Sequence, residues 1–451
     1  MNVLIIGSGY VGVNTGVVLA YLGHNVTCID INEEKIASLR QGKSHFYEPH
    51  LDDVLQITLP RLRFVTKYDE ADIPNTDVIF ITVGTPSLSD GNADLTYVRS
   101  AVEGIAKNLG EKFTVIVNKS TVPIGSGNLV EALIREQFTN SHNNGAKHNF
   151  SVVSSPEFLA QGSALHDSFY PDRIVVGSQD EKSIAVLKEL FSALMGQKFP
   201  EPPGLPRPMG LTEVPMVVTD ITSAEMIKYA ANAFLALKIS YINEIGRLSA
   251  KLGADIQAVS RGIGLDQRIG KRFLNAGLGW GGSCFGKDTA ALVAIARDYK
   301  LDMPIISAAR EINYSQRELA VDLLQEKLKI LKGKRVTLLG FSFKPNTDDL
   351  RDAPSINISQ KLVQRGALVR VHDPVALTNA RRQYPDLGVT FCDDVRDALK
   401  NAEAIILVTE WPQYLDLDWE AIPPVPIVDG RNFLDRERLE ALGFTVIGMG
   451  R

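Results

Sequence analysis

The first thirty residues limit the fold more than any other part of the chain. Residues 3–6 are an apolar run too short for a helix, and Gly7, Gly9 and Gly12 follow in G-x-G-x-x-G spacing. Glycine permits a tight turn at the first position, a close backbone approach at the second and helix–strand packing at the third. A helical segment, a second strand and Asp30 come next in register. This order predicts the opening unit of a parallel α/β sheet.

The same unit predicts a dinucleotide site. The helix after the turn presents free N–H groups and a positive dipole end to phosphates. Asp30 lies at the end of the second strand, where it can accept hydrogen bonds from both ribose hydroxyls. A carboxylate there repels a 2′-phosphate, so we expect NAD rather than NADP. The alternative is a glycine turn that binds no ligand.

Three further strands carry polar residues at their carboxyl ends. Thr85 follows a predicted strand over residues 78–83, Ser120 and Thr121 follow the next, and Glu157 follows a third. Ligands of open parallel sheets bind outside these strand ends. We therefore expect these side chains to face one crevice, although each alone could be an ordinary loop residue.

Length and composition narrow the class of protein. A chain of 451 residues indicates two or three domains, and a net charge of −5 argues against a nucleic-acid or anionic-membrane surface. Cys28, Cys284 and Cys392 are odd in number and widely spread, which favours a reducing compartment. We expect no signal peptide and no membrane span, and hence a soluble cytoplasmic protein without a metal site.

The middle of the chain changes character twice. Residues 198–210 are dense in proline and glycine and predict a loop or linker that closes the first domain. Residues 219–253 have no proline and apolar residues three and four apart, which predicts one long helix and a dimer contact. Lys228 and Asn232 share a face of it. From the pattern alone, Lys228 is expected to be a surface cation.

The segment GWGGSCFGKD, residues 279–288, places Cys284 among glycines. Flexible backbone is a poor place for a small buried hydrophobe and a suitable place for a thiol that meets a substrate. Arg268, Lys271 and Arg272 precede it. They suit an anionic, phosphate-bearing substrate, or they form an ordinary solvated helix end.

The last third repeats the opening pattern without its glycines. Strands are expected over residues 335–339 and 368–372, with Gly340 after the first and Asp373 after the second. This predicts a second nucleotide-type α/β domain that does not hold a dinucleotide in the same manner. Lys344, Arg351 and Arg431 lie at strand ends suited to phosphate contacts. The predicted domains are 1–210, 211–310 and 311–451.

Taken together, the motifs resemble the UDP-glucose 6-dehydrogenase family within the nucleotide-sugar dehydrogenases. The matching segments span nearly the whole chain: GSGYVG, VGTP, KSTVP, SPEFLAQGSA, PDRIVVG, SAEMIKYAANAFLALKISYINEI, DQRIG, GGSCFGKD and GFSFKPNTDDLRDAPS. The resemblance implies two Rossmann-like domains joined by a long central helix and a helical dimerisation region. It also implies oxidation of a primary alcohol to a carboxylate with two NAD, through a thiohemiacetal and a thioester.

The resemblance assigns roles residue by residue. It implies that Cys284 is the nucleophile, that Lys228 and Asn232 stabilise oxyanions, and that Glu157, Thr121 and Asp288 position water and move protons. The implied cofactor contacts are Gly7, Gly9, Tyr10, Val11, Gly12, Asp30, Lys35, Thr85, Pro86, Ser120, Thr121, Glu157, Lys287 and Arg351. The implied sugar-nucleotide contacts are Phe158, Leu159, Ala160, Gln161, Lys228, Asn232, Arg268, Asn275, Gly279, Trp280, Gly281, Phe343, Lys344 and Arg431. Arg268 matches an arginine that reaches the neighbouring subunit's substrate, so a homodimer is the expected minimal unit.

Two positions depart from the family's pattern. Gly286 stands where proline is common, and Gln161 replaces a frequent glutamate. UDP-glucose is the expected substrate, and GDP-mannose or a UDP-N-acetylhexosamine are the alternatives. More distant alternatives are a two-electron 3-hydroxyacid dehydrogenase, which needs no cysteine, and a non-catalytic NAD-binding protein.

Overall fold

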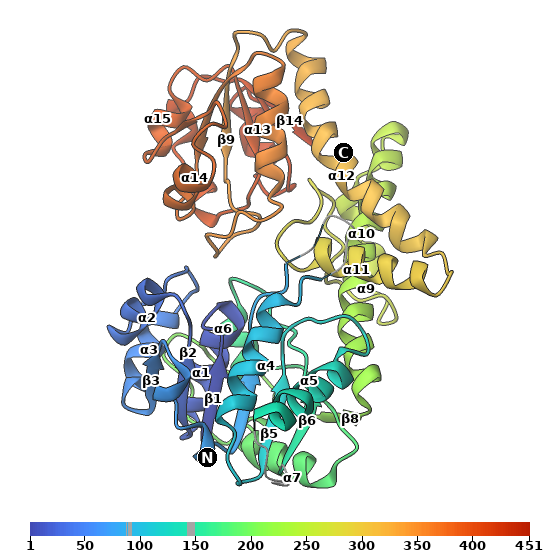
Figure 1. The fold of residues 1–451 in the computed structure, drawn as a ribbon. Helices are drawn as coiled ribbons and strands as arrows, with labels where there is room; N and C mark the ends of the chain where they lie inside the picture. Colours follow the sequence, from blue (N-terminus) through green and yellow to red (C-terminus); the bar gives the residue numbers. More distant parts are fainter. Residues whose placement is uncertain (87, 89–92, 142–148) are drawn as a thin grey trace. The chain divides into compact units, whose positions relative to one another are not determined.

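A computed structural model describes residues 1–86, 88, 93–141 and 149–451 (Figure 1). The chain forms two compact units, Met1–Ala230 and Ala231–Arg451. Each unit is built around one twisted, mainly parallel sheet with helices on its faces. Among the described residues, no helix combines the length and the apolar character that a membrane crossing needs.

The first unit contains an eight-stranded sheet in the order β3-β2-β1-β4-β5-β6-β7-β8. All neighbours are parallel except β6 and β7. Its strands are β1 (Asn2–Ile6), β2 (Asn25–Ile29), β3 (Leu62–Val65), β4 (Val78–Ile81), β5 (Thr114–Asn118), β6 (Phe150–Ser154), β7 (Ile174–Gly177) and β8 (Met216–Thr219). The sheet takes its last strand from beyond residue 210, and the three predicted domain ranges stay a prediction.

Alternating side chains place a core on each face of this sheet. In β1, Val3 and Ile5 enter one core, while Leu4 and Ile6 enter the other. Strands buried on both faces read as continuous apolar runs, which is why β1, β4 and β5 stand out in the sequence. The helices are α1 (Tyr10–Tyr21), α2 (Glu33–Arg40), α3 (Leu51–Thr58), α4 (Thr96–Asn108), α5 (Ser126–Ser141), α6 (Ala164–Phe169), α7 (Glu181–Leu190) and α8 (Ser192–Met195).

The proline-rich segment is a packed strap, which we define as residues 198–214. Residues 198–210 contain no helix or strand, as predicted, and residues 211–214 contain none either. Leu205 enters the first core, and its carbonyl accepts a hydrogen bond of 2.9 Å from the Tyr170 hydroxyl. Arg207 donates to the Phe199 carbonyl at 2.8 Å. At its tip, Met209 is fully exposed. The strap therefore covers the core of the first unit.

The long helix α9 (Ile221–Leu252) confirms the predicted central helix, and the boundary between the units falls within it. The second unit continues with α10 (Ile256–Gly264), α11 (Phe285–Asp298) and α12 (Pro304–Leu328). The segment before α11 is irregular and glycine-rich; residues 277–284 are called the Cys284 loop below.

A six-stranded parallel sheet completes the second unit, in the order β11-β10-β9-β12-β13-β14. Its strands are β9 (Arg335–Leu339), β10 (Leu368–His372), β11 (Thr390–Phe391), β12 (Ala404–Leu407), β13 (Pro426–Asp429) and β14 (Thr445–Gly448). The accompanying helices are α13 (Pro354–Gln364), α14 (Leu377–Gln383), α15 (Val395–Leu399) and α16 (Arg436–Ala441). β9 and β10 match the two strands predicted here.

Candidate active site

The glycine turn of the first unit has no room for a side chain at Gly7 and Gly12, but it has open space at Gly9. Gly7 has φ +98°, which favours glycine, and a Cβ added to Gly12 would lie 1.9 Å from the Gly7 carbonyl oxygen. At Gly9, by contrast, an added Cβ would meet no atom within 4 Å. Gly9 is also the N-cap of α1, where no side chain caps the helix. The first helical N–H groups are thus left for a ligand.

Asp30 has acceptor capacity to spare. Its Oδ2 accepts from the Ser8 N–H at 2.9 Å and its Oδ1 from the Asn32 N–H at 3.0 Å, and the Lys35 ammonium lies 3.9 Å away. A carboxylate has about four lone-pair sites, so ribose hydroxyls can still be accepted. The buried Ser8 hydroxyl has no hydrogen-bond partner among the described residues. Together with the opening at Gly9, this donor and acceptor set fits a dinucleotide.

Tyr10, inside the glycine turn, belongs to a buried network that sequence reasoning missed. Its hydroxyl donates to the Glu48 carboxylate, and the Gly162 N–H donates to the Tyr10 oxygen at 2.8 Å and to Glu48 at 2.7 Å. Burial raises the pKa of Glu48 above its usual range, although the hydrogen bonds oppose this. The network joins the glycine turn to the loop that carries residues 158–161.

Glu157 and Lys228 form a buried ion pair in the first unit. The Lys228 ammonium lies 3.0 Å from Glu157 Oε1, and the Leu159 N–H donates to Oε2 at 2.6 Å. Burial alone would raise the pKa of Glu157. The charge and hydrogen bond of Lys228, with the Leu159 N–H and the charge of Lys119, outweigh burial and hold that pKa below its usual range. The helix pattern, which favoured a surface cation at Lys228, was therefore wrong.

Lys119 is a second amine in this region, and the sequence analysis did not select it. It follows β5 directly, and its charge acts on both Glu157 and Lys228. Burial lowers the pKa of Lys119 to about 8, with Lys228 adding to the effect and Glu157 opposing it. Its position next to the polar residues Ser120 and Thr121 was the available signal.

The two predicted residues beside Lys119 are held by hydrogen bonds. The Ser120 hydroxyl donates to the Val83 carbonyl at 2.8 Å, and the Thr85 hydroxyl donates to the Thr121 carbonyl at 2.7 Å. Phe158 lies against two cations, Arg173 at 3.7 Å and Lys228 at 5.5 Å from its ring centre. In the first unit, Thr85 is thus bonded to Thr121, and the charge of Lys119, two residues before Thr121, acts on Glu157.

Cys284 is the N-cap residue of α11, and its carbonyl accepts from the Asp288 N–H at 2.8 Å. The buried Asp288 carboxylate receives two side-chain donors. Asn232 Nδ2 lies 2.6 Å from Oδ2, and Lys287 Nζ lies 2.6 Å from Oδ1. The Ser283 hydroxyl is 3.7 Å from the Cys284 sulfur. In the second unit, four predicted residues therefore surround the start of one helix.

Arg351 adds a positive charge to this group. Its carbonyl accepts from the Gly282 N–H at 2.9 Å, and its guanidinium pairs with Asp349 at 2.6 Å. Burial lowers the pKa of Arg351, but the hydrogen bond and charge of Asp349 and the charge of Cys284 raise it above its usual value. A neighbouring cation favours the thiolate form of a cysteine, which is the nucleophilic form.

Arg431 joins the Cys284 loop to the segment that carries Phe343. Its guanidinium donates to the Gly279 carbonyl at 3.2 Å and the Phe343 carbonyl at 3.4 Å, and it pairs with Glu410 at 3.2 Å. A Cβ at Gly282 would lie 2.8 Å from the Phe343 ring, so glycine is needed there. The Lys344 ammonium lies 5.7 Å from the same ring centre.

Arg268 and Asn275 are not gathered with these residues within the second unit. Arg268 is solvent-exposed and pairs with Asp266 at 2.5 Å, and Asn275 is exposed. Neither makes a contact in the second unit that would support its predicted part in sugar-nucleotide binding.

Comparison with known proteins assigns both units to one family. Three domains of one family match in order: its NAD-binding domain at residues 1–195, its central domain at 222–315 and its UDP-binding domain at 337–436. The chain belongs to the UDP-glucose/GDP-mannose dehydrogenase family. It is an NAD-dependent oxidoreductase, and a nucleotide sugar is its class of substrate.

Individual relatives cover the full length. UDP-glucose 6-dehydrogenase YwqF of Bacillus subtilis is 42% identical across 100% of this chain and 98% of its own. The enzyme named UDP-glucose 6-dehydrogenase in Rickettsia conorii is 40% identical across 100% and 99%. A UDP-glucose dehydrogenase structure from Pyrobaculum islandicum superposes with TM-score 0.88 at 39% identity, covering 100% of this chain and 97% of that one. The predicted fold class, family and cofactor are thereby confirmed.

Proposed function

We propose that the chain oxidises UDP-glucose to UDP-glucuronate with two NAD, and that Cys284 is the nucleophile. The observation that carries this proposal is the surroundings of Cys284, a thiol at the start of a helix with Asp288, Asn232, Lys287 and Arg351 about it. Relatives about 40% identical over their full length carry the name UDP-glucose 6-dehydrogenase, which supports the choice of sugar nucleotide.

The first oxidation removes a proton and a hydride from the C6 alcohol and leaves an aldehyde. NAD, when bound, accepts the hydride of each oxidation. In this proposal the Lys228 ammonium and the Asn232 amide stabilise the oxyanion that develops, because both are fixed donors in buried surroundings. Glu157, held ionised by Lys228, takes the proton directly or through water.

The Cys284 thiolate then adds to the aldehyde carbon and gives a thiohemiacetal. Loss of the second hydride leaves a thioester, and water hydrolyses it to the carboxylate and the restored thiol. The covalent intermediate divides one difficult oxidation into two easier steps. Asp288, held by Asn232 and Lys287, orients the water or the thiol rather than attacking itself.

The cofactor contacts we propose are the glycine turn, Asp30 and Lys35, with Thr85, Ser120 and Thr121 at neighbouring strand ends. The sugar-nucleotide contacts are residues 158–161 in the first unit, and the Cys284 loop, Phe343, Lys344 and Arg431 in the second. In support of the cofactor set, the space beside Gly9 is open. In support of the sugar-nucleotide set, Arg431 donates to the carbonyls of Gly279 in the Cys284 loop and of Phe343.

The proposal is tested by counting NADH formed per UDP-glucose consumed, with the sugar nucleotide limiting. A ratio near two supports the alcohol-to-acid oxidation, whereas a ratio near one contradicts the thioester step. Cys284→Ser should lose net turnover. Retained turnover in that variant would favour a two-electron dehydrogenase that needs no thiol. A ratio of two with GDP-mannose and no reaction with UDP-glucose would keep the mechanism and change the substrate.

We also propose a homodimer that forms through α9. Phe234, Tyr241 and Leu248 are exposed apolar residues seven apart on this helix, and Leu252 continues the same stripe. Exposed contiguous apolar surface of this kind is typical of a protein interface. Leu248→Glu should shift the mass measured by light scattering to that of a monomer; an unchanged mass would place the interface elsewhere. A reducing cytoplasm suits the three cysteines, none of which forms a disulfide in the described chain.

A further inference from the structure

One buried guanidinium in the second unit connects three segments of chain. Arg317 lies on α12, and its side chain is 3% exposed. Nη1 donates to Asp352 Oδ1 at 2.7 Å and to Asn357 Oδ1 at 2.5 Å. Nη2 donates to the Trp280 carbonyl at 3.0 Å and to the Asp352 carbonyl at 3.1 Å. The helix, the Cys284 loop and the segment after Arg351 thus meet at one side chain.

A second residue of α12, Asn313, also binds the backbone of Trp280 in the Cys284 loop. Asn313, one turn before Arg317 on α12, accepts from the Trp280 N–H at 2.6 Å and donates to the Trp280 carbonyl at 3.0 Å. Trp280 is four residues before Cys284. Its backbone is therefore fixed on both sides by α12.

The segment on the other side of Arg317 is also fixed closely against the loop. The Gly282 N–H donates to the Arg351 carbonyl at 2.9 Å, and a Cβ at Gly281 would lie 2.5 Å from the Asp352 carbonyl oxygen. Asp352 itself has φ +50°, an uncommon conformation that surrounding contacts must maintain. Arg317 supplies two of those contacts.

We propose that Arg317 is a positioning residue that fixes the Cys284 loop against residues 351–352, so that the thiol and the Arg351 charge keep their mutual geometry. The inference rests on the proposed function, because it gives Cys284 the nucleophilic role. It extends that function to Arg317, whose described hydrogen bonds go to Trp280, Asp352 and Asn357.

An arginine is required because its planar fork serves four acceptors at once. A lysine ammonium on a flexible stem has three donors and cannot reproduce two parallel pairs of bonds. Asp352 Oδ2 is buried without a hydrogen-bond partner among the described residues, and it lies 3.4 Å from where a Cβ at Gly286 would stand. A side chain at position 286, where proline is common in the family, would thus contact this carboxylate in the first turn of α11.

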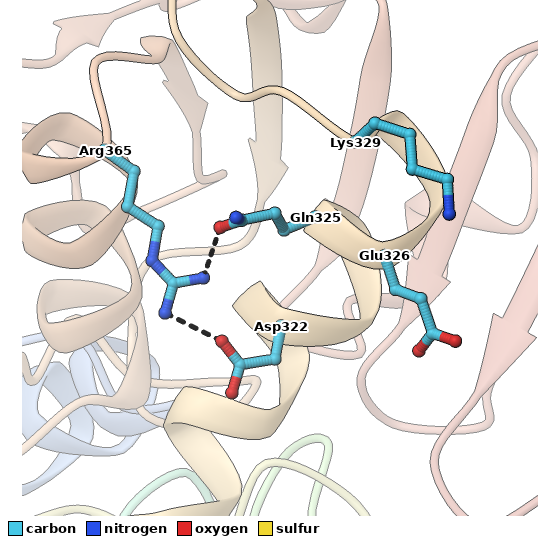
Figure 2. A pocket seen from close by; sticks show the side chains of 5 residues that line it. All are labelled: Asp322, Gln325, Glu326, Lys329 and Arg365. Carbon is cyan, nitrogen blue, oxygen red and sulfur yellow. Dashed lines mark hydrogen bonds and ion pairs between the residues drawn. The ribbon is translucent and has the colours of Figure 1, made fainter.

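The chain supplies a matched control. Arg365 follows α13, and its guanidinium also reaches α12, donating to Gln325 Oε1 at 2.7 Å and Asp322 Oδ1 at 2.7 Å (Figure 2). It lines an open surface pocket with Glu326 and Lys329. Arg365 thus joins α13 to α12, as Arg317 does through Asn357 of α13, and none of its described contacts reaches the Cys284 loop.

The test compares Arg317→Lys and Arg365→Lys in the full-length protein. Three quantities are measured: steady-state constants, the thermal midpoint, and the rate at which iodoacetamide alkylates Cys284 as a function of pH. Arg317→Lys should lower kcat at least about tenfold, since small misplacements of reacting groups are costly. Alkylation at pH 7 should slow at least about threefold, with its midpoint at higher pH, because Arg351 no longer stays beside the thiol. Arg365→Lys should leave all of these unchanged.

A purely structural role would lower the thermal midpoint and leave kcat and the alkylation curve intact well below that midpoint, and this result would overturn the inference. Asp352→Asn and Asn357→Ala give the same test if Arg317→Lys does not fold, with smaller effects in the same direction. Retained turnover in Cys284→Ser would instead defeat the proposed function. Failure of the inference about Arg317 and failure of the proposed function would therefore give different results.

Discussion

In both sheets a carboxylate follows the second strand, Asp30 in the first unit and Asp373 in the second. The surroundings repeat: the Gly7 N–H donates to the Ile29 carbonyl, and the Gly340 N–H donates to the His372 carbonyl, both at 2.8 Å. Yet Asp30 accepts two backbone hydrogen bonds, whereas Asp373 accepts six from its own unit.

The six donors to Asp373 explain why this carboxylate has little acceptor capacity left for a ligand. The N–H groups of Phe341, Ser342, Val375 and Ala376 bind the carboxylate, with the Ser342 hydroxyl and the Trp411 indole. The indole donates to Oδ2 at 3.2 Å and so occupies acceptor capacity that is free in Asp30. One residue type at one topological position thus keeps acceptor capacity free in the first sheet and binds six groups of its own unit in the second.

Removing the two carboxylates should give opposite results. Asp373→Ala leaves six buried donors unsatisfied, and we expect it to destabilise the second unit by about 3–5 kcal/mol. Asp30→Ala should cost about 1 kcal/mol or less and raise the Kd for NAD at least about tenfold. Calorimetry and NAD titration of both variants measure this, and equal losses of stability would remove the distinction.

β5 in the first sheet and β13 in the second occupy corresponding positions, and the cations that follow them have different surroundings. Arg431, after β13, is paired with Glu410 and donates to carbonyls, whereas Lys119, after β5, is held at a pKa of about 8 mainly by burial. The usual pKa is 10.5, so the folded state resists protonation of Lys119. This penalty is absent above pH 10.5, grows as the pH falls towards 8 and is complete below 8.

Lys119→Met should therefore stabilise the first unit at pH 7 by roughly 1–3 kcal/mol, and the gain should fade between pH 8 and 10.5. Denaturation of the variant and the native chain across that range measures it. A gain that does not depend on pH would show that packing, rather than charge, is responsible.

The second glycine of the turn is a smaller test of the open crevice. An alanine at Gly9 would meet no protein atom within 4 Å, so Gly9→Ala should leave the thermal midpoint nearly unchanged and raise the Kd for NAD about tenfold. Gly262→Ala in α10 is the control, since its added Cβ also meets nothing. That variant should gain up to about 1 kcal/mol and bind NAD normally. Unchanged NAD affinity in Gly9→Ala would place the pyrophosphate elsewhere.

The smallest effect concerns the indole at Asp373. Trp411→Phe keeps most of the ring in the core and removes one of the six donors. We expect a loss of about 1 kcal/mol in the stability of the second unit. A loss of stability as large as that of Asp373→Ala would mean that Trp411 stabilises the second unit mainly through packing of its ring and not through the hydrogen bond.

The sequence predicted what local patterns encode. The glycine turn, the strands over residues 335–339 and 368–372 and the long helix α9 all follow from spacing and apolar periodicity. The exposed edge strand β8 has no such signal, because it lacks the continuous burial of central strands. Periodicity also could not place Lys228 inside, since its partner Glu157 lies 71 residues away.

The same limit applies to the site. Motifs identified Cys284 and Asp288 because both stand in one short glycine-rich segment, GGSCFGKD, which also carries the family resemblance. Arg317 and Asp352 are 35 residues apart and belong to no shared motif, so their pairing is visible only after folding. The missing glycines predicted that the second domain does not hold a dinucleotide in the manner of the first. They did not reveal the six donors to Asp373, because these come from two separate segments besides its own.

The strap over the first core gives the protein a place for attachment. Its anchors, Leu205 and Arg207, lie before the tip, where Met209 is fully exposed and Gly210 has open space around it. A cysteine introduced by Met209→Cys can therefore carry a fluorophore, a spin label or a link to a solid support without disturbing the fold, while Cys28 stays buried beneath the helices. Cys392 in the second unit is half-buried and would also react, so the background is Cys284→Ser with Cys392→Ser. In that background the probe reports on tumbling and association of the first unit without modifying the nucleophile's position.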